Sequence, residues 1–271
     1  MRRQARCVVS CLVLAAATAR SADNNTAWVA QAGSANGVVA SQAGLAGTAD
    51  VAQWGDNQAT SVYQAGNSDM LLVSQAGALN SVAVVQTANL QSASIEQTGS
   101  GNSASVTQSV DAAWADISQV GDGNIASIAQ APSADAASNA ANEAAISQLG
   151  STNAAALAQS GAGNAASAVQ SGDGNVLNLV QSGTVNVAQV MQATSAAEAF
   201  VIQSGQMNQA SVTQDGAGDV THVQQSGTGN QATANAYGAN DRIDITQIGN
   251  GLQIAVTTTG NNTRASVMQG R

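Results

Sequence analysis

Glutamine recurs every eleven residues along almost the whole chain, and this period constrains the fold more than any other feature. After one step of eighteen residues the series resumes with the same spacing, and Ala236 and Thr258 replace Gln in two rows. The chain thus holds twenty-two rows. The Gln positions are 31, 42, 53, 64, 75, 86, 97, 108, 119, 130, 148, 159, 170, 181, 192, 203, 214, 225, 247 and 269. Such a repeat predicts a fold of stacked units, each contacting mainly its neighbours.

Each row follows one line, Gln-x-Gly-x-x-Asn-x-Ala-x-Val-x-Gln. Its Asn, Ala, Val and Gln positions are two residues apart, which is the period of a β-strand, so these four side chains share one face. The residues between them are small or polar, and the Gly-rich segment between rows is typical of a tight turn. Each row therefore predicts a strand of about seven residues and a turn of about four.

Two rows running in opposite directions would close a flat coil, and coils would stack about 4.8 Å apart. Identical residues would then lie above one another, and stacked side-chain amides could donate and accept hydrogen bonds along a column. We therefore predict an all-β fold, a parallel β-solenoid (β-helix) of about eleven two-strand coils built from 11-residue half-repeats. A meander of antiparallel hairpins fits the same period, but it would pair unlike columns.

This fold assigns a role to each conserved position of the repeat line. The predicted ladder of buried amides contains Asn102, Gln108, Gln119, Asn124, Gln130, Asn164, Gln170, Asn175, Gln181, Asn208, Gln214 and Asn230. The predicted core strip contains Ala104, Val106, Ala126, Ile128 and Val212. The predicted turn glycines are Gly99, Gly121, Gly161, Gly172, Gly205 and Gly227.

The composition excludes several other classes of protein. Only 8% of the residues are charged and 2% are aromatic, whereas an ordinary globular domain has about 25% charged residues. Disorder is the competing interpretation of a chain so rich in small polar residues, but a disordered chain need not be periodic. No run after the N-terminus approaches the roughly 20 apolar residues of a membrane-spanning helix.

The chain offers little for catalysis or for metal binding. His222 is the one histidine, and both cysteines, Cys7 and Cys11, lie near the N-terminus. A Ser-His-Asp site or a histidine metal cluster is therefore not expected. The Gly-Asp-Gly-Asn segments that begin at Gly121 and at Gly172 are interpreted as turns. We predict that the protein is not an enzyme and needs no cofactor.

The N-terminus predicts a secretory signal peptide over residues 1–19. Arg2, Arg3 and Arg6 precede an apolar run that ends in Ala17-Thr18-Ala19, a typical cleavage site. A lipoprotein site ending at Cys11 and a twin-Arg signal are the weaker interpretations. Cleavage would leave four basic residues against sixteen acidic ones, so nucleic acid is not an expected partner.

One insertion interrupts the rows. The step from Gln130 to Gln148 contains seven extra residues and the one proline, Pro132. We expect an inserted loop over residues 131–141, between a first block of repeats over 20–130 and a second block over 142–271.

The repeat resembles that of curlins, the subunits of bacterial curli amyloid fibres. The resemblance rests on lines such as "QTGSGNSASVTQ" at 97–108, "QVGDGNIASIAQ" at 119–130 and "QSGAGNAASAVQ" at 159–170, and it covers about residues 25 to 269. It implies a secreted structural subunit that is exported through the periplasm, polymerises with itself into a cell-surface fibre, and serves adhesion and the biofilm matrix.

The resemblance also implies partners, namely a curlin nucleator, an outer-membrane secretion channel and chaperones. The usual Gly- and Asn-rich targeting segment is missing, since only Arg20 to Asn24 precede the first row. The minor curlin, which nucleates fibres, has a basic last repeat, so Arg242, Arg264 and Arg271 are candidates for nucleation or attachment. The sequence pI of about 4.1 favours the acidic major subunit. A monomeric adhesin stalk and an ice-binding protein are the alternatives from other classes.

Two further expectations concern assembly. The first and last rows keep the repeat pattern and carry no obvious cap, so the end coils are expected to present unpaired strand edges through which subunits stack. Asp69, Asp219 and Asp241 occupy the Asn column. Buried carboxylates in a stack repel one another, so these three are candidate gatekeepers that slow assembly.

Overall fold

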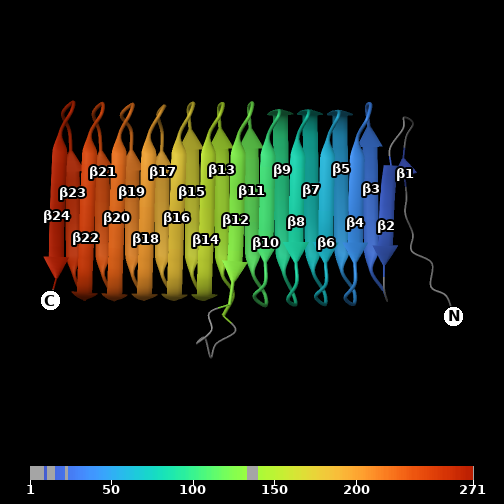
Figure 1. The fold of residues 1–271 in the computed structure, drawn as a ribbon, viewed down its shortest axis with the longest axis horizontal. Coiled ribbons are helices and arrows are strands. Elements are labelled where there is room, and N and C mark those ends of the chain that lie inside the picture. Colours follow the sequence, from blue (N-terminus) through green and yellow to red (C-terminus); the bar gives the residue numbers. More distant parts are fainter. Residues whose placement is uncertain (1–8, 11–15, 22–23, 133–139, 271) are drawn as a thin grey trace. The chain divides into compact units, whose positions relative to one another are not determined.

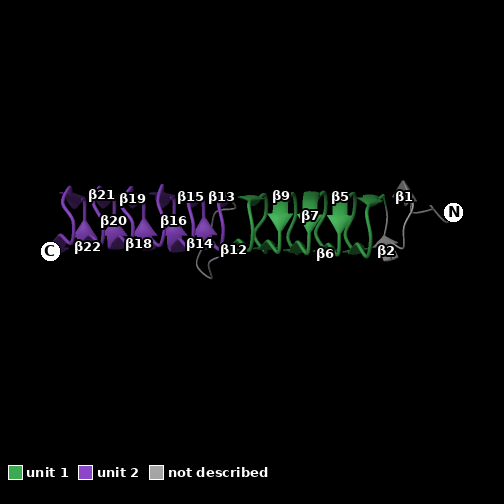
Figure 2. Cartoon of the chain, turned by 90° about the horizontal axis from the view of Figure 1, so that it is seen from above, with its two compact units in different colours: residues 1–130 green, residues 131–271 purple. Residues whose placement is uncertain are grey.

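The computed structural model describes the backbone of residues 9–10, 16–21, 24–132 and 140–270, with side chains from residue 24 onward. The chain divides into two compact units, unit 1 over residues 1–130 and unit 2 over residues 131–271 (Figure 2). All regular elements of the described residues are β-strands (Figure 1). Among these residues no helix is long and apolar enough to cross a membrane.

In unit 1 the odd-numbered strands form one parallel sheet (sheet A), in the order β1-β3-β5-β7-β9-β11. The even-numbered strands form a second one (sheet B), in the order β2-β4-β6-β8-β10-β12. The strands are Val9–Ser10 (β1), Ala16–Ser21 (β2), Thr26–Ala32 (β3), Gly37–Gln42 (β4), Thr48–Asp56 (β5), Ala59–Gln64 (β6), Met70–Ala78 (β7), Ser81–Gln86 (β8), Ser92–Ser100 (β9), Ser103–Gln108 (β10), Trp114–Val120 (β11) and Ile125–Ala131 (β12).

Unit 2 repeats this arrangement. Its sheet A has the order β13-β15-β17-β19-β21-β23, and its sheet B has the order β14-β16-β18-β20-β22-β24. The strands are Glu143–Leu149 (β13), Ala154–Ala162 (β14), Ala165–Ser171 (β15), Val176–Thr184 (β16), Val187–Gln192 (β17), Glu198–Gln206 (β18), Gln209–Gln214 (β19), Val220–Thr228 (β20), Gln231–Ala236 (β21), Arg242–Asn250 (β22), Gln253–Thr258 (β23) and Arg264–Gly270 (β24).

The register of the sheets is set by the repeat. Each strand from β3 onward pairs in parallel with the strand twenty-two residues further along its unit, so that Gln108 lies beside Gln130 and Val190 beside Val212. The prediction of a parallel β-solenoid is confirmed, with five coils from β3 to β12 and six from β13 to β24. The antiparallel meander is excluded.

The core of each unit is a thin strip between its two sheets. Inward residues of a strand alternate with outward ones, as in β10, where Ala104, Val106 and Gln108 are buried. The predicted strip residues Ala126, Ile128 and Val212 are also buried. Because the apolar strip is only two small side chains wide per strand, the amides on either side of it must be satisfied by hydrogen bonds.

Two predicted segments fall largely outside the described residues. The insertion over 131–141 lies between β12 and β13, and its residues 133–139 are not described. The predicted signal peptide includes β1 and part of β2, and the expected cleavage point after Ala19 lies within β2. β1 pairs with β3, and β2 pairs with β4 from Ala16–Gly37 to Ser21–Gln42.

Candidate assembly site

Columns of glutamine run along both sheets of each unit. Gln108 Nε2 donates to Gln130 Oε1 at 3.0 Å, and Gln181 Nε2 donates to Gln203 Oε1 at 2.8 Å. Each amide also reaches a backbone carbonyl sixteen residues earlier, as Gln108 does at Ser92 at 3.1 Å. These side chains are fully buried, and the bonds offset the cost of removing an amide from water. The predicted ladder members Gln119, Gln170 and Gln214 lie in the corresponding columns of sheet A.

The glutamine columns have a direction. In each described Gln–Gln bond the earlier residue donates and the residue twenty-two positions later accepts. At the N-terminal end, Oε1 of Gln31 and of Gln42 therefore find no donor among the described residues. At the C-terminal end, Gln269 Oε1 has none either, and the column of sheet A gives way to Ala236 and Thr258.

The asparagine column works differently from the predicted ladder. Asn102 Oδ1 accepts the backbone N–H of Asn124 at 3.0 Å, and Asn102 Nδ2 donates to Gly121 O at 2.7 Å. The side chain therefore braces the turn of the next coil, because Asn is one methylene shorter than Gln and its amide lies beside the turn backbone. Direct Asn–Asn bonds accompany this in part of unit 2, as between Asn186 and Asn164 at 3.1 Å. The predicted members are all buried, namely Asn102, Asn124, Asn164, Asn175, Asn208 and Asn230.

The predicted turn glycines are required for two reasons. All six have φ between 107° and 123°, a region that side chains avoid. A Cβ on Gly99 would also lie 2.0 Å from Gly121 O in the next coil. The turn backbones of successive coils are therefore too close for any side chain at this position. The six are Gly99, Gly121, Gly161, Gly172, Gly205 and Gly227.

The three gatekeeper candidates are fully buried carboxylates in the asparagine column. Asp219 Oδ1 accepts the backbone N–H of Asp241 at 2.9 Å, and Asp219 Oδ2 accepts that of Gly216 at 3.1 Å. A carboxylate cannot donate to the carbonyl of the next turn. In the Asp rows the glycine after Gln lacks the positive φ of the Asn rows, as at Gly66, Gly216 and Gly238. The residue in the asparagine column, Asn or Asp, is thus correlated with the backbone conformation of the turn before it. Sequence reasoning did not predict this correlation.

Burial changes the acidity of these carboxyls. It raises the pKa of Asp69 and of Asp219, and hydrogen bonds from backbone N–H groups oppose the effect only in part. The charge of Asp241 adds to the increase at Asp219. At Asp241 burial also acts to raise the pKa, but hydrogen bonds from Thr263 and Thr258 outweigh it, and the pKa is lowered. In the folded chain Asp69 and Asp219 therefore take up a proton more readily than ordinary aspartates.

Exposed turns carry a second set of contacts between coils. Asp122 Oδ1 accepts the backbone N–H of Ser100 at 2.8 Å, and Asp173 Oδ1 accepts that of Ser151 at 2.8 Å. These aspartates are in the Gly-Asp-Gly-Asn segments that the sequence identified only as turns. The sequence signal that could have identified them is a side chain able to accept a hydrogen bond, three residues after Gln. At this position it lies beside the turn backbone N–H of the preceding coil.

The arginine candidates lie on the outer face of sheet B in unit 2. Arg242 Nε lies 2.8 Å from Asp244 Oδ2, and Asp244 Oδ1 lies 3.2 Å from His222 Nδ1. Arg264 is the register neighbour of Arg242, and Arg271 lies outside the described residues. The basic character of this region is therefore partly neutralised by Asp244. Within the described ranges no group of three or more His, Cys, Asp or Glu could hold a metal ion.

The two ends of the described solenoid differ in how well they are covered. At the N-terminal end, where β2 pairs with β4, the inward Val38 is only 1% exposed. β23 and β24 are the last strands of their sheets. Val256 in β23 is 9% exposed, and no residue of β24 is fully buried. Among the described residues no further strand pairs with the outer edge of this final coil, and its apolar strip is the more exposed of the two.

Comparison with known families agrees with this geometry. The curlin associated repeat matches residues 80–109 and 140–172, of which the first segment lies in unit 1 and the second in unit 2. No curated protein sequence matches the chain. The matched segments form the same kind of coil as the other rows, so the chain carries curlin associated repeats in both units.

Proposed function

We propose that the protein is a secreted structural subunit of extracellular, curli-type amyloid fibres, and that subunits assemble by stacking their end coils. The observation that carries the proposal is the open final coil formed by β23 and β24. An uncovered edge of two parallel strands is a template for further strands. A second copy of the same repeat supplies strands of the same length and pattern.

The first coil of a second copy would fit this edge in register. Both unit 1 from β3 onward and unit 2 contain whole coils, so stacking keeps the column positions in register. Val256 would precede Val29, and Gln269 Nε2 would face Gln42 Oε1, which has no donor within the described chain. Arg264 would precede Gly37, so no two like charges meet there. The junction therefore continues the apolar strip of sheet A and the glutamine column of sheet B, while Thr258 would precede Gln31 in sheet A.

The N-terminal segment determines when the edge of the first coil, formed by β3 and β4, is free to receive another subunit. β1 and β2 occupy the edge of the first coil, and cleavage after Ala19 would remove most of both strands. The resemblance to curlins adds two points to this proposal. The chain is exported through the periplasm and a secretion channel, and its partners include chaperones and a curlin nucleator. Adhesion and a role in the biofilm matrix have the same basis.

We favour the major fibre subunit over the minor nucleator. The basic cluster that would mark a nucleator is partly neutralised, because Asp244 pairs with Arg242. The chain as a whole has a formal net charge of −9.

The test is assembly of the chain that starts at Arg20. It is diluted from denaturant and followed by thioflavin T fluorescence, electron microscopy and fibre diffraction. The proposal expects seedable fibres with a meridional spacing of about 4.7–4.8 Å. A folded monomer that stays soluble would contradict it and favour the stalk or the ice-binding protein.

A further inference from the structure

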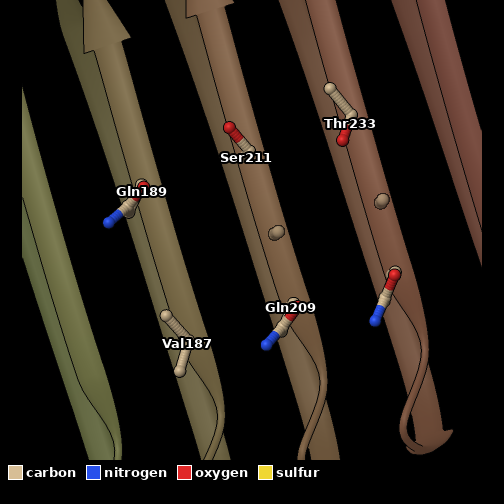
Figure 3. Close-up of a pocket in the computed structure, with 8 residues that line it drawn as sticks. Val187, Gln189, Gln209, Ser211 and Thr233 are labelled. Atoms are coloured by element: carbon tan, nitrogen blue, oxygen red, sulfur yellow. The ribbon is translucent and has the colours of Figure 1, made fainter.

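The outer surface of sheet A in unit 2 has one charged side chain, the outward Glu143 at the start of β13. The outward residues of the following strands β15, β17, β19, β21 and β23 are uncharged, and we call them the neutral face of unit 2. Gln189, Gln209, Ser211, Gln231 and Thr233 are among them (Figure 3). All of its outward residues are amides, hydroxyls or small apolar side chains.

The opposite sheet of unit 2 carries the other outward charges of its strands. Glu198, Arg242, Asp244 and Arg264 point outward from β18, β22 and β24. In unit 1 the arrangement is reversed, because sheet A carries Asp50, Glu96 and Asp116 while β4 to β12 of sheet B have no outward charge. The outward strand charges therefore lie on sheet A in unit 1 and, apart from Glu143 of β13, on sheet B in unit 2.

The net charge decides which surfaces of two copies can meet. With a net charge of −9, copies repel one another wherever carboxylates come together. The neutral face of unit 2 avoids this repulsion. Its polar groups can pair with the same groups of another copy across sheets about 10 Å apart.

The shape of the neutral face also suits packing against a second sheet. Two shallow grooves of about 320 and 250 Å³ lie along it. The first runs between Val187, Gln189, Gln209 and Thr233, whose side chains stand apart on neighbouring strands (Figure 3). The second includes Met191 and Val169 in its lining. Side chains of an opposing sheet could enter such grooves.

The area of the face favours fibres over free dimers. Five strands spaced about 4.8 Å apart, each about 20 Å long, cover roughly 500 Å². This is less than the roughly 800 Å² per partner of a standard stable interface. Single subunits would therefore stay unpaired, whereas two fibres would form many such contacts at once.

We propose that fibres of this protein associate side by side through the neutral face of unit 2, with a second copy of the chain as the occupant. This inference rests on the proposed function, because it requires that fibres form.

The test adds charge to this face without changing side-chain shape. Gln189→Glu with Gln231→Glu places two carboxylates on the neutral face, at two exposed positions. Gln224→Glu with Asn178→Asp is the matched control, because it places two carboxylates at exposed positions of sheet B in the same unit. Fibre width is measured by electron microscopy and bundling by sedimentation, with seeded elongation rates as the check on folding.

We expect wild-type and control fibres to bundle, and the variant of the neutral face to elongate at the same rate but remain single. Salt at about 1 M should restore its bundling, because it screens the added charges. Equal bundling of all three proteins would overturn the inference, as would equal loss in variant and control. A wild type whose fibres stay single but bind neutral dextran or cellulose through this face would also overturn it. If no fibres form at all, the proposed function itself fails.

Discussion

At the scale of single residues, the inward glutamines matter because each one is both donor and acceptor in its column. Gln181 accepts from Gln159 at 2.9 Å and donates to Gln203 at 2.8 Å. Gln181→Leu would leave the Gln203 oxygen without its donor inside the fold. We expect it to lower the free energy of unfolding by about 2 kcal/mol, measured as the urea midpoint of solubilised chain. Gln224→Leu, at an exposed outward position, should change it by no more than about 0.5 kcal/mol.

The buried carboxyls make assembly depend on pH. Because the pKa of Asp69 and of Asp219 is raised in the folded state, their protonation stabilises the fold below the unfolded value near 4. That stability is lost as pH rises through the folded pKa. The pKa of Asp241 is lowered in the folded state. The stability that Asp241 contributes is therefore present above the unfolded value and is lost as pH falls through the folded pKa. We therefore expect a shorter lag before fibre formation at pH 5 than at pH 7, measured by thioflavin T.

Removal of the two stacked carboxylates tests whether they act as gatekeepers. Asp219→Asn with Asp241→Asn should shorten the lag at pH 7 and reduce the difference between pH 5 and pH 7. Asp116→Asn with Asp50→Asn removes the same charge from the outer face of sheet A in unit 1 and is the control. An unchanged lag in the buried pair, or an equal effect in the control, would refute the gatekeeper role.

At the scale of strands and turns, the strand period and the parallel register could be predicted from sequence, because both follow from the spacing of Asn, Ala, Val and Gln. The turn type could not be predicted from sequence. It depends on bonds between coils, such as Asn102 to Gly121 nineteen residues later. For the same reason the Asn column looked like a second amide ladder, whereas its amides mainly brace the backbone. The acceptor role of Asp122 was missed because it too concerns the preceding coil.

Neighbouring glycines of one turn offer a matched pair of substitutions. Gly99→Ala would drive a Cβ to 2.0 Å from Gly121 O, whereas Gly101→Ala meets nothing within 4 Å, although both have positive φ. We expect Gly101→Ala to cost about 1–2 kcal/mol for its left-handed backbone. Gly99→Ala should cost clearly more, because it also forces two coils apart. Denaturant unfolding of the two variants compares them directly, and equal costs would mean that coils are not packed this closely.

At the scale of the whole molecule, the strand pairing of the N-terminal segment predicts a difference between the chain from Met1 and the chain from Arg20. In a fibre with one kind of junction, covering one end of every subunit blocks growth. The chain from Met1 should therefore show a longer lag than the chain from Arg20 and should slow its elongation when added in small amounts. Seeded growth measured with the two chains separately and mixed would show this. Equal elongation would indicate that β1 and β2 do not protect the first coil.

End-to-end stacking of subunits is the central claim, and cross-linking between two single-cysteine proteins tests it most directly. The chain from Arg20 has no cysteine of its own, and Ser266 and Val39 occupy the same outward column of sheet B. When fibres are grown from a mixture of Ser266→Cys and Val39→Cys chains, the account predicts covalent heterodimers on mild oxidation. A mixture of Ser266→Cys and Ala83→Cys, whose column position lies two coils further inside, should give almost none. Equal yields from both mixtures, or none from the first, would contradict stacking of the end coils.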